Sequence, residues 1–123
     1  MADATLHVCT TCRRGLPLAE DAPRPGALML AALLAGDAPA GVAIKGIECL
    51  SASNNGCAVA LSAPGKWSYV YGNLAPDQHA GAILEGAALY AASADGIVPW
   101  RARPEIFRKQ SLARIPPQEP RND

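Results

Sequence analysis

Four cysteines form two pairs in this 123-residue chain. Cys9 and Cys12 enclose two threonines in "CTTC", whereas Cys49 and Cys57 enclose the seven residues "LSASNNG", with Ser53 among them. Thiolates that converge from two loops suit a tetrahedral zinc site or a [2Fe-2S] cluster. A lone CxxC is common, and the second spacing is not that of a zinc knuckle. The two pairs together predict a metal centre with Cys9, Cys12, Cys49 and Cys57 as its ligands.

The polar residues between Cys49 and Cys57 favour such a centre, because their hydroxyls, amides and backbone N–H groups can hydrogen-bond to thiolate and sulfide. Two other interpretations stay open. Cys57 can be a small buried hydrophobe beside a tight turn. The CxxC can also exchange disulfides, as in thioredoxin-like oxidoreductases. There the motif opens a helix whose dipole lowers the thiol pKa, whereas here a Pro-rich loop follows Cys12.

Charge and composition exclude several classes of function. Lysine plus arginine and aspartate plus glutamate both number 11, which argues against nucleic-acid and membrane partners. The chain shows neither a secretory leader nor a long apolar run, so we expect a cytoplasmic protein whose cysteines stay reduced. His7 and His79 are poor candidates for a catalytic base, and no catalytic triad, carboxylate pair or phosphate loop is evident. We therefore expect no enzymatic activity and no catalytic residue.

The pattern of apolar residues predicts the elements that must position the thiols. Strands are expected over 4–9 and within 41–49, and a hairpin is expected over 57–74 around "APGK". Helices are expected over 25–35 and over about 80–91, and a loop over 10–24. This order predicts an α+β sandwich, with a mixed sheet of about four strands and two helices. Both cysteine pairs would then lie in loops at one end of neighbouring strands.

We expect one metal-binding domain over 1–115 and a disordered Pro/Arg-rich tail over 116–123. The row formed by Trp67, Tyr69 and Tyr71 either docks a partner or, as we favour, packs against the apolar residues of "VPWRARPEIF". The arginines in and just after that segment would suit an acidic partner or be solvated: Arg101, Arg103 and Arg108. An exposed sheet edge or face would allow a homodimer.

Three blocks of sequence carry a resemblance that covers nearly the whole chain: "HVCTTCR", "ECLSASNNGCAVALSAPGKWSYVYGNL" and "DGIVPWRARPEIFRKQSLARIPP". They resemble the bacterial predicted metal-binding proteins of the domain of unknown function 1636 family, whose fold is similar to the thioredoxin-like [2Fe-2S] ferredoxins. The resemblance implies that fold, a [2Fe-2S] cluster, and one-electron transfer to a redox or metal-handling protein.

One position departs from the family pattern. Relatives read Cys-Leu-Ser-Ala-Cys where this chain reads "CLSAS", so Ser53 stands where the resemblance implies a fourth cysteine. Ser53 could ligate through oxygen, but we favour Cys57 as the fourth ligand because four thiolates suit a soft metal site. The alternatives are a zinc- or cobalt-binding protein without redox function, or a ferredoxin fold that has lost its cluster and serves as an interaction domain.

Overall fold

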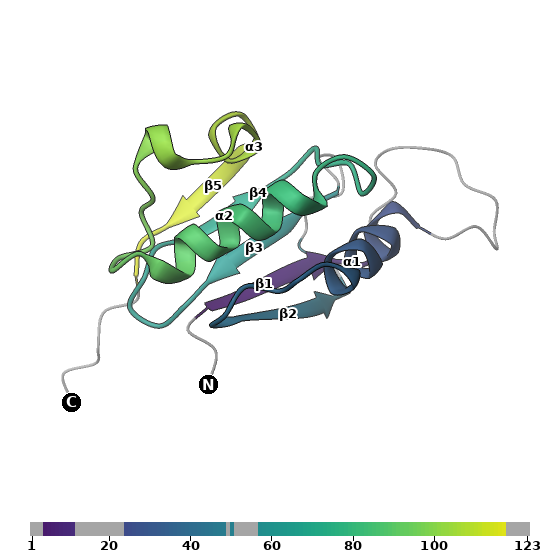
Figure 1. The fold of residues 1–123 in the computed structure, drawn as a ribbon, viewed down its shortest axis with the longest axis horizontal. Helices are drawn as coiled ribbons and strands as arrows, with labels where there is room; N and C mark the ends of the chain where they lie inside the picture. Colours follow the sequence, from purple (N-terminus) through teal and green to yellow (C-terminus); the bar gives the residue numbers. More distant parts are fainter. Residues whose placement is uncertain (1–3, 12–23, 49, 51–56, 118–123) are drawn as a thin grey trace.

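The structure is a computed structural model that describes residues 4–11, 24–48, 50 and 57–117. Its elements, in chain order, are β1 (Ala4–Cys9), α1 (Pro25–Ala35), β2 (Val42–Ile47), β3 (Val59–Ser62), β4 (Ser68–Tyr71), α2 (Ala80–Ala92), the 3-10 helix η2 (Trp100–Ala102), α3 (Glu105–Lys109) and β5 (Ser111–Ile115). The strands form one sheet in the order β2-β1-β3-β4-β5 (Figure 1). β1 and β2 run parallel, and the other neighbouring strands run antiparallel.

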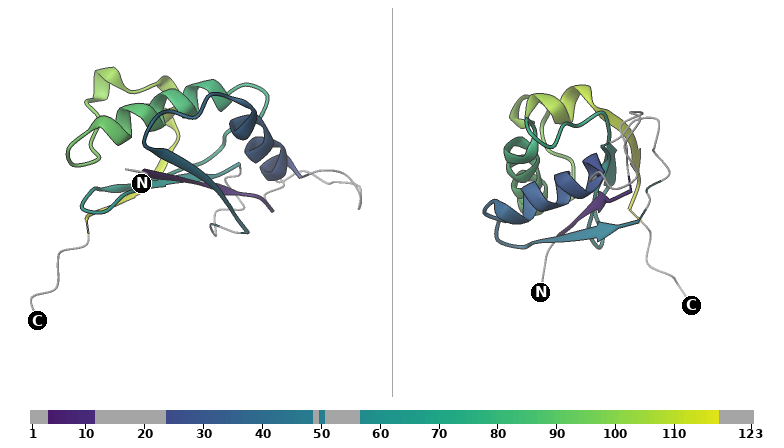
Figure 2. Two further views of the ribbon diagram at one scale, coloured as in Figure 1. Left: turned by 60° about the horizontal axis from the view of Figure 1, so that its bottom comes forward. Right: turned by 90° about the vertical axis from the view of Figure 1, so that its right-hand side faces the viewer.

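The helices lie together on one face of the sheet (Figure 2). β1 alternates accordingly: Leu6 and Val8 are completely buried, whereas Thr5 and His7 are half-buried. Opposite them α1 and α2 bury one stripe each, which comprises Met29, Leu33, Ile83, Ala87 and Tyr90 among others. None of the helices in the described part of the chain combines the length and apolar character that a membrane crossing requires.

The predicted fold class is confirmed, and so are the strand over 4–9, the helix over 25–35 and the hairpin. Within the described residues the sheet has five strands, where about four were expected, and α3 adds a short α-helix to the two expected. The sequence did not predict β5. All of its side chains are exposed, so it has no alternation of apolar and polar residues. Much of the expected 10–24 loop (12–23) and of the 116–123 tail (118–123) falls outside the described residues.

The aromatic row of β4 packs against the C-terminal segment, as we favoured. Tyr69 and Tyr71 are each 3% exposed. The ring of Tyr71 stacks on that of Phe107 with a centroid distance of 4.0 Å, and the Arg103 guanidinium lies 5.7 Å from the Tyr69 centroid. Stacked rings of this kind contribute about 0.5–1.5 kcal/mol beyond their burial. The segment after α2 is therefore anchored on the sheet.

Tyr90 lies in the core beneath this segment. Its hydroxyl donates a 2.6 Å hydrogen bond to the Trp67 carbonyl. Burial, reinforced by nearby Tyr69, raises the pKa of Tyr90 to about 12. We expect Tyr90→Phe to lower the free energy of unfolding by about 1–2 kcal/mol near neutral pH, because the buried carbonyl loses its donor. Urea denaturation measures this loss.

The pH dependence of the stability that Tyr90 contributes follows from its raised pKa. An unfolded tyrosine ionises near pH 10, so the stabilisation is complete below that pH and is lost as the pH rises toward about 12. The unfolding free energy of the parent protein should therefore fall above pH 10, and that of Tyr90→Phe should fall less steeply. Parallel slopes for the two proteins would contradict this assignment.

Candidate metal centre

Three strand ends meet at one end of the sheet, which we call the cysteine end. β1 finishes at Cys9 and parallel β2 finishes at its register partner Ile47. β3 runs antiparallel to β1, so it begins at this same end, directly after Cys57 and Ala58. The described residues that end β1 and β2 and those that begin β3 therefore share one end of the sheet.

Cys9 is held in place by the sheet. Its backbone N–H donates a 3.1 Å hydrogen bond to the Ala58 carbonyl, and its Sγ lies 3.8 Å from the Glu48 carbonyl oxygen. By the alternation of β1, its side chain belongs to the face of Thr5 and His7, which no described helix covers. Cys9 is nevertheless only 2% exposed. The thiol thus sits in a sheltered position beside the chain that leaves β2.

Two hydrogen bonds that the sequence did not predict join Thr11, which follows β1, to Glu48 after β2 and to Arg24 before α1. The Thr11 hydroxyl donates to the Glu48 carbonyl at 2.5 Å, and Arg24 donates through Nη1 to the Thr11 carbonyl at 2.9 Å. Thr11 precedes Cys12 in the sequence, and Glu48 precedes Cys49. The residues that lead into these two cysteines are therefore bonded to each other. The only sequence signal was the threonine pair inside "CTTC".

Cys57 belongs to the same buried core cluster as Cys9. It is completely buried, and its backbone N–H and carbonyl both bond to Leu74 at 3.2 Å. The bonds to Leu74 lie one residue out of step with the β3–β4 register, in which Val59 faces Tyr71. Cys9 and Cys57 therefore lie at the same end of neighbouring strands.

Both histidines have hydrogen-bond partners within the described structure. His7 Nε2 lies 3.1 Å from Ser62 Oγ, and burial, followed by the charge of Lys45, holds the pKa of His7 below its ordinary value. His7 is therefore neutral near pH 7. Nδ1 of His79 accepts a 2.8 Å hydrogen bond from the Ala75 N–H, so this residue shapes the turn that leads into α2.

Cys12, Cys49 and Ser53 lie outside the described residues, so their roles as ligands stay predictions. Within the ranges that the structure describes, no group of three or more His, Cys, Asp or Glu residues is close enough to hold a metal ion. Two of the four cysteines are missing from those ranges. The structure thus places Cys9 and Cys57 at the cysteine end and leaves the completed ligand set to experiment.

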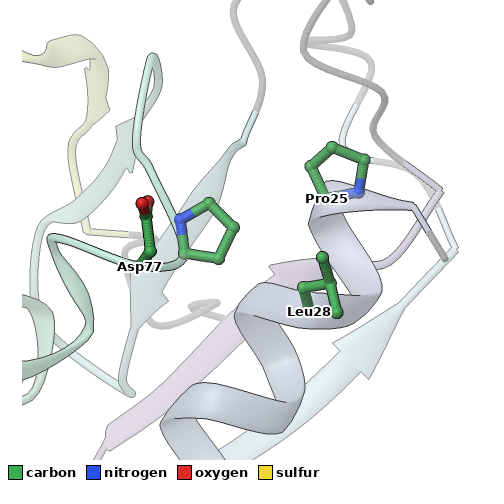
Figure 3. A pocket seen from close by; sticks show the side chains of 4 residues that line it. Pro25, Leu28 and Asp77 are labelled. Carbon is green, nitrogen blue, oxygen red and sulfur yellow. The ribbon is translucent and has the colours of Figure 1, made fainter. Parts of the chain in front are cut away.

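A hollow of about 490 Å³ opens beside the start of α1. It is lined by Pro25, Leu28, Pro76 and Asp77, and Figure 3 shows Pro25 and Leu28 on α1 across from Asp77. The Asp77 carboxylate is the one ionisable group among these lining residues.

Comparison with known proteins places this geometry in context. The model of the family described as "Protein of unknown function (DUF1636)" matches residues 6–117. The chain belongs to this family. The match takes in β3, β4 and the C-terminal elements as well as the cysteine end, so the resemblance expected from the three sequence blocks is confirmed for the DUF1636 chain.

A solved structure shares the fold of the DUF1636 protein. It is a thioredoxin-like [2Fe-2S] ferredoxin from Aquifex aeolicus, 19% identical in sequence with a TM-score of 0.58. The likeness covers 97% of this chain and 99% of that one. At this level of identity it establishes the fold. No curated protein matches the chain.

Proposed function

We propose that this DUF1636 protein is a cytoplasmic ferredoxin-like protein that holds a [2Fe-2S] cluster and exchanges single electrons with a protein partner, without being an enzyme. The observation that carries the proposal is the hydrogen bond between Thr11 and Glu48. It joins the two residues that lead into Cys12 and Cys49, at the end of the sheet where Cys9 also lies. The fold shared with a [2Fe-2S] ferredoxin supports it.

The proposed ligands are Cys9, Cys12, Cys49 and Cys57, with Ser53 as the alternative to Cys57. Their chemistry fits the group, since iron–sulfur clusters are held by cysteine thiolates. A bound cluster supplies a one-electron redox couple, and the residues around it set the potential through hydrogen bonds and exclusion of water. The nearly complete burial of Cys9 would act through the second of these, because it would keep water from the ligating sulfur.

The first experiment is a metal analysis of untagged protein purified without oxygen. Iron, zinc, cobalt and acid-labile sulfide are measured per chain beside the visible spectrum. We expect about two irons and two sulfides per chain and a brown protein. Zinc or cobalt without sulfide would instead identify a metal-handling protein, and protein with no metal and four inert thiols would contradict both metal-binding functions.

A second candidate is an interaction domain that has lost its cluster. The position of Cys57 favours it, because complete burial in an apolar core explains this cysteine without any metal. The serine at position 53 points the same way. In that case, replacing Cys9, Cys12 and Cys49 together with serine would leave the fold and partner binding unchanged.

A further inference from the structure

The charge of the chain is divided unevenly between two parts of the molecule. We call η2, α3 and β5, residues 100–115, the C-terminal lobe. It contains five basic residues and one acidic residue, Glu105, which gives a formal charge of +4: Arg101, Arg103, Arg108, Lys109 and Arg114. The whole chain has a formal charge of zero, so the remaining residues together carry −4. The lobe is therefore strongly basic although the net charge of the chain is zero.

The lobe forms one edge of the sheet. β5 is the last strand in the sheet order and pairs with β4 on one side. All five of its side chains are exposed, and Figure 1 shows it on the opposite side of the sheet from α1 and β2. An edge strand presents backbone donors and acceptors that an extended segment of another protein can pair with.

Apolar side chains accompany the positive charge. Trp100 is 59% exposed, Leu112 is 40% exposed and Ile115 is 55% exposed. The guanidinium of Arg103 lies 5.4 Å from the Trp100 ring centroid, while its Nε donates a 2.7 Å hydrogen bond to the Val98 carbonyl. These contacts hold Arg103 and Trp100 in place before any partner arrives. Fixed tryptophan and arginine side chains are the residues that dominate binding energy at protein interfaces.

The lobe also reaches toward the cysteine end. The Gly72 N–H donates a 3.0 Å hydrogen bond to the Gln110 carbonyl, and the Asn73 amide lies 3.3 Å from Gln110 Oε1. The next residue, Leu74, is the one that bonds to the backbone of Cys57. A partner on the lobe would therefore sit next to the strand ends that carry the candidate ligands.

We propose that the C-terminal lobe is the docking surface for an acidic protein partner, which pairs an extended acidic segment with β5 and covers Trp100. That the docked protein is an electron-transfer partner rests on the proposed function. The docking itself does not rest on it. Nucleic acid fits less well, because domains that bind it are basic overall and this chain has a sequence pI of about 6.7.

The test uses two synthetic peptides of equal length as probes, one alternating glutamate with valine and one alternating lysine with valine. Binding is followed by Trp100 fluorescence, with Trp100→Phe to assign the signal. We expect the acidic peptide to bind and the lysine peptide not to bind. Affinity for the acidic peptide should fall as salt is raised beyond about 0.1 M, because the charges are exposed.

Charge reversal then locates the surface. Arg108→Glu on α3 and Lys45→Glu on β2 change the net charge equally, and both parent side chains are exposed at different edges of the sheet. We expect Arg108→Glu to weaken acidic-peptide binding about three- to tenfold and Lys45→Glu to weaken it less than about twofold. Equal weakening by both variants would overturn the proposal.

Two further outcomes would also overturn it: equal binding of the lysine peptide, or tighter binding of duplex DNA or phosphatidylserine vesicles than of the acidic peptide. None of these readouts depends on iron. A protein that lacks a cluster yet binds the acidic peptide would refute the proposed function and leave the docking surface standing. A protein that contains iron but does not bind the acidic peptide would refute the docking surface and leave the proposed function standing.

Discussion

Cys9→Ser protein purified without oxygen is expected to contain less iron and sulfide than the parent protein by a factor of about ten or more. Loss of a partner outside the ligand shell already costs about 10–100-fold in metal affinity, and a ligand thiolate matters more. Serine is nearly the size of cysteine, so the sheltered position at the end of β1 should remain filled. Iron per chain, sulfide per chain and the visible spectrum measure the loss.

A matched pair of variants identifies the fourth ligand in the same assay. If Cys57 is a ligand, Cys57→Ala loses the cluster while Ser53→Ala keeps it, and the reverse holds if Ser53 ligates. Cys57→Ala also removes a completely buried side chain, so its unfolding free energy should be measured beside its iron content. Unchanged iron in Cys9→Ser protein would remove Cys9 from the ligand set and with it the proposed centre.

Gly86→Ala is expected to lower the free energy of unfolding by about 1–3 kcal/mol, because it overpacks the contact between α2 and α3. A methyl group at this position would lie 2.5 Å from Cζ and 2.6 Å from Cδ2 of Phe107. The Phe107 ring cannot move aside freely, since it is 2% exposed and stacks on Tyr71. Chemical denaturation measures the change.

Gly81 offers the matched control within the same helix. A methyl group at Gly81 would meet no atom within 4 Å, and the residue is exposed. Gly81→Ala should therefore leave stability unchanged or raise it by up to about 1 kcal/mol through helix propensity. Equal effects of the two substitutions would show that α3 does not pack on α2 as described.

Local signals were enough to predict the first half of the fold. Pro25 at the first helical position and Gly36 at the C-cap delimit α1 as the sequence indicated. The alternation in "ATLHVC" fixed β1 and placed Cys9 at its end. The C-terminal elements gave no such signal: α3 is five residues long, shorter than two helical turns, and β5 buries no side chain.

The details of the candidate site depend on long-range register, which a single sequence does not encode in any local pattern. The bond from Thr11 to Glu48 joins residues 37 positions apart and exists because β1 and β2 pair in parallel. Likewise, the sequence left Cys57 as either a metal ligand or a small buried hydrophobe, and its burial beside Leu74 became visible only in the structure. A cysteine is both a ligand and a small apolar side chain, so its type alone did not distinguish the two roles.

The order in which the chain is synthesised bears on the cysteine end. β1 is synthesised before β2 and β3, but in the finished sheet it lies between them. At about 5–20 residues per second, β3 follows β1 by roughly 3–12 s. During that interval β3 cannot yet shelter the Cys9 thiol from oxidants or stray metal ions. The nearly complete burial of Cys9 therefore arises only after β3 has been synthesised and has paired with β1.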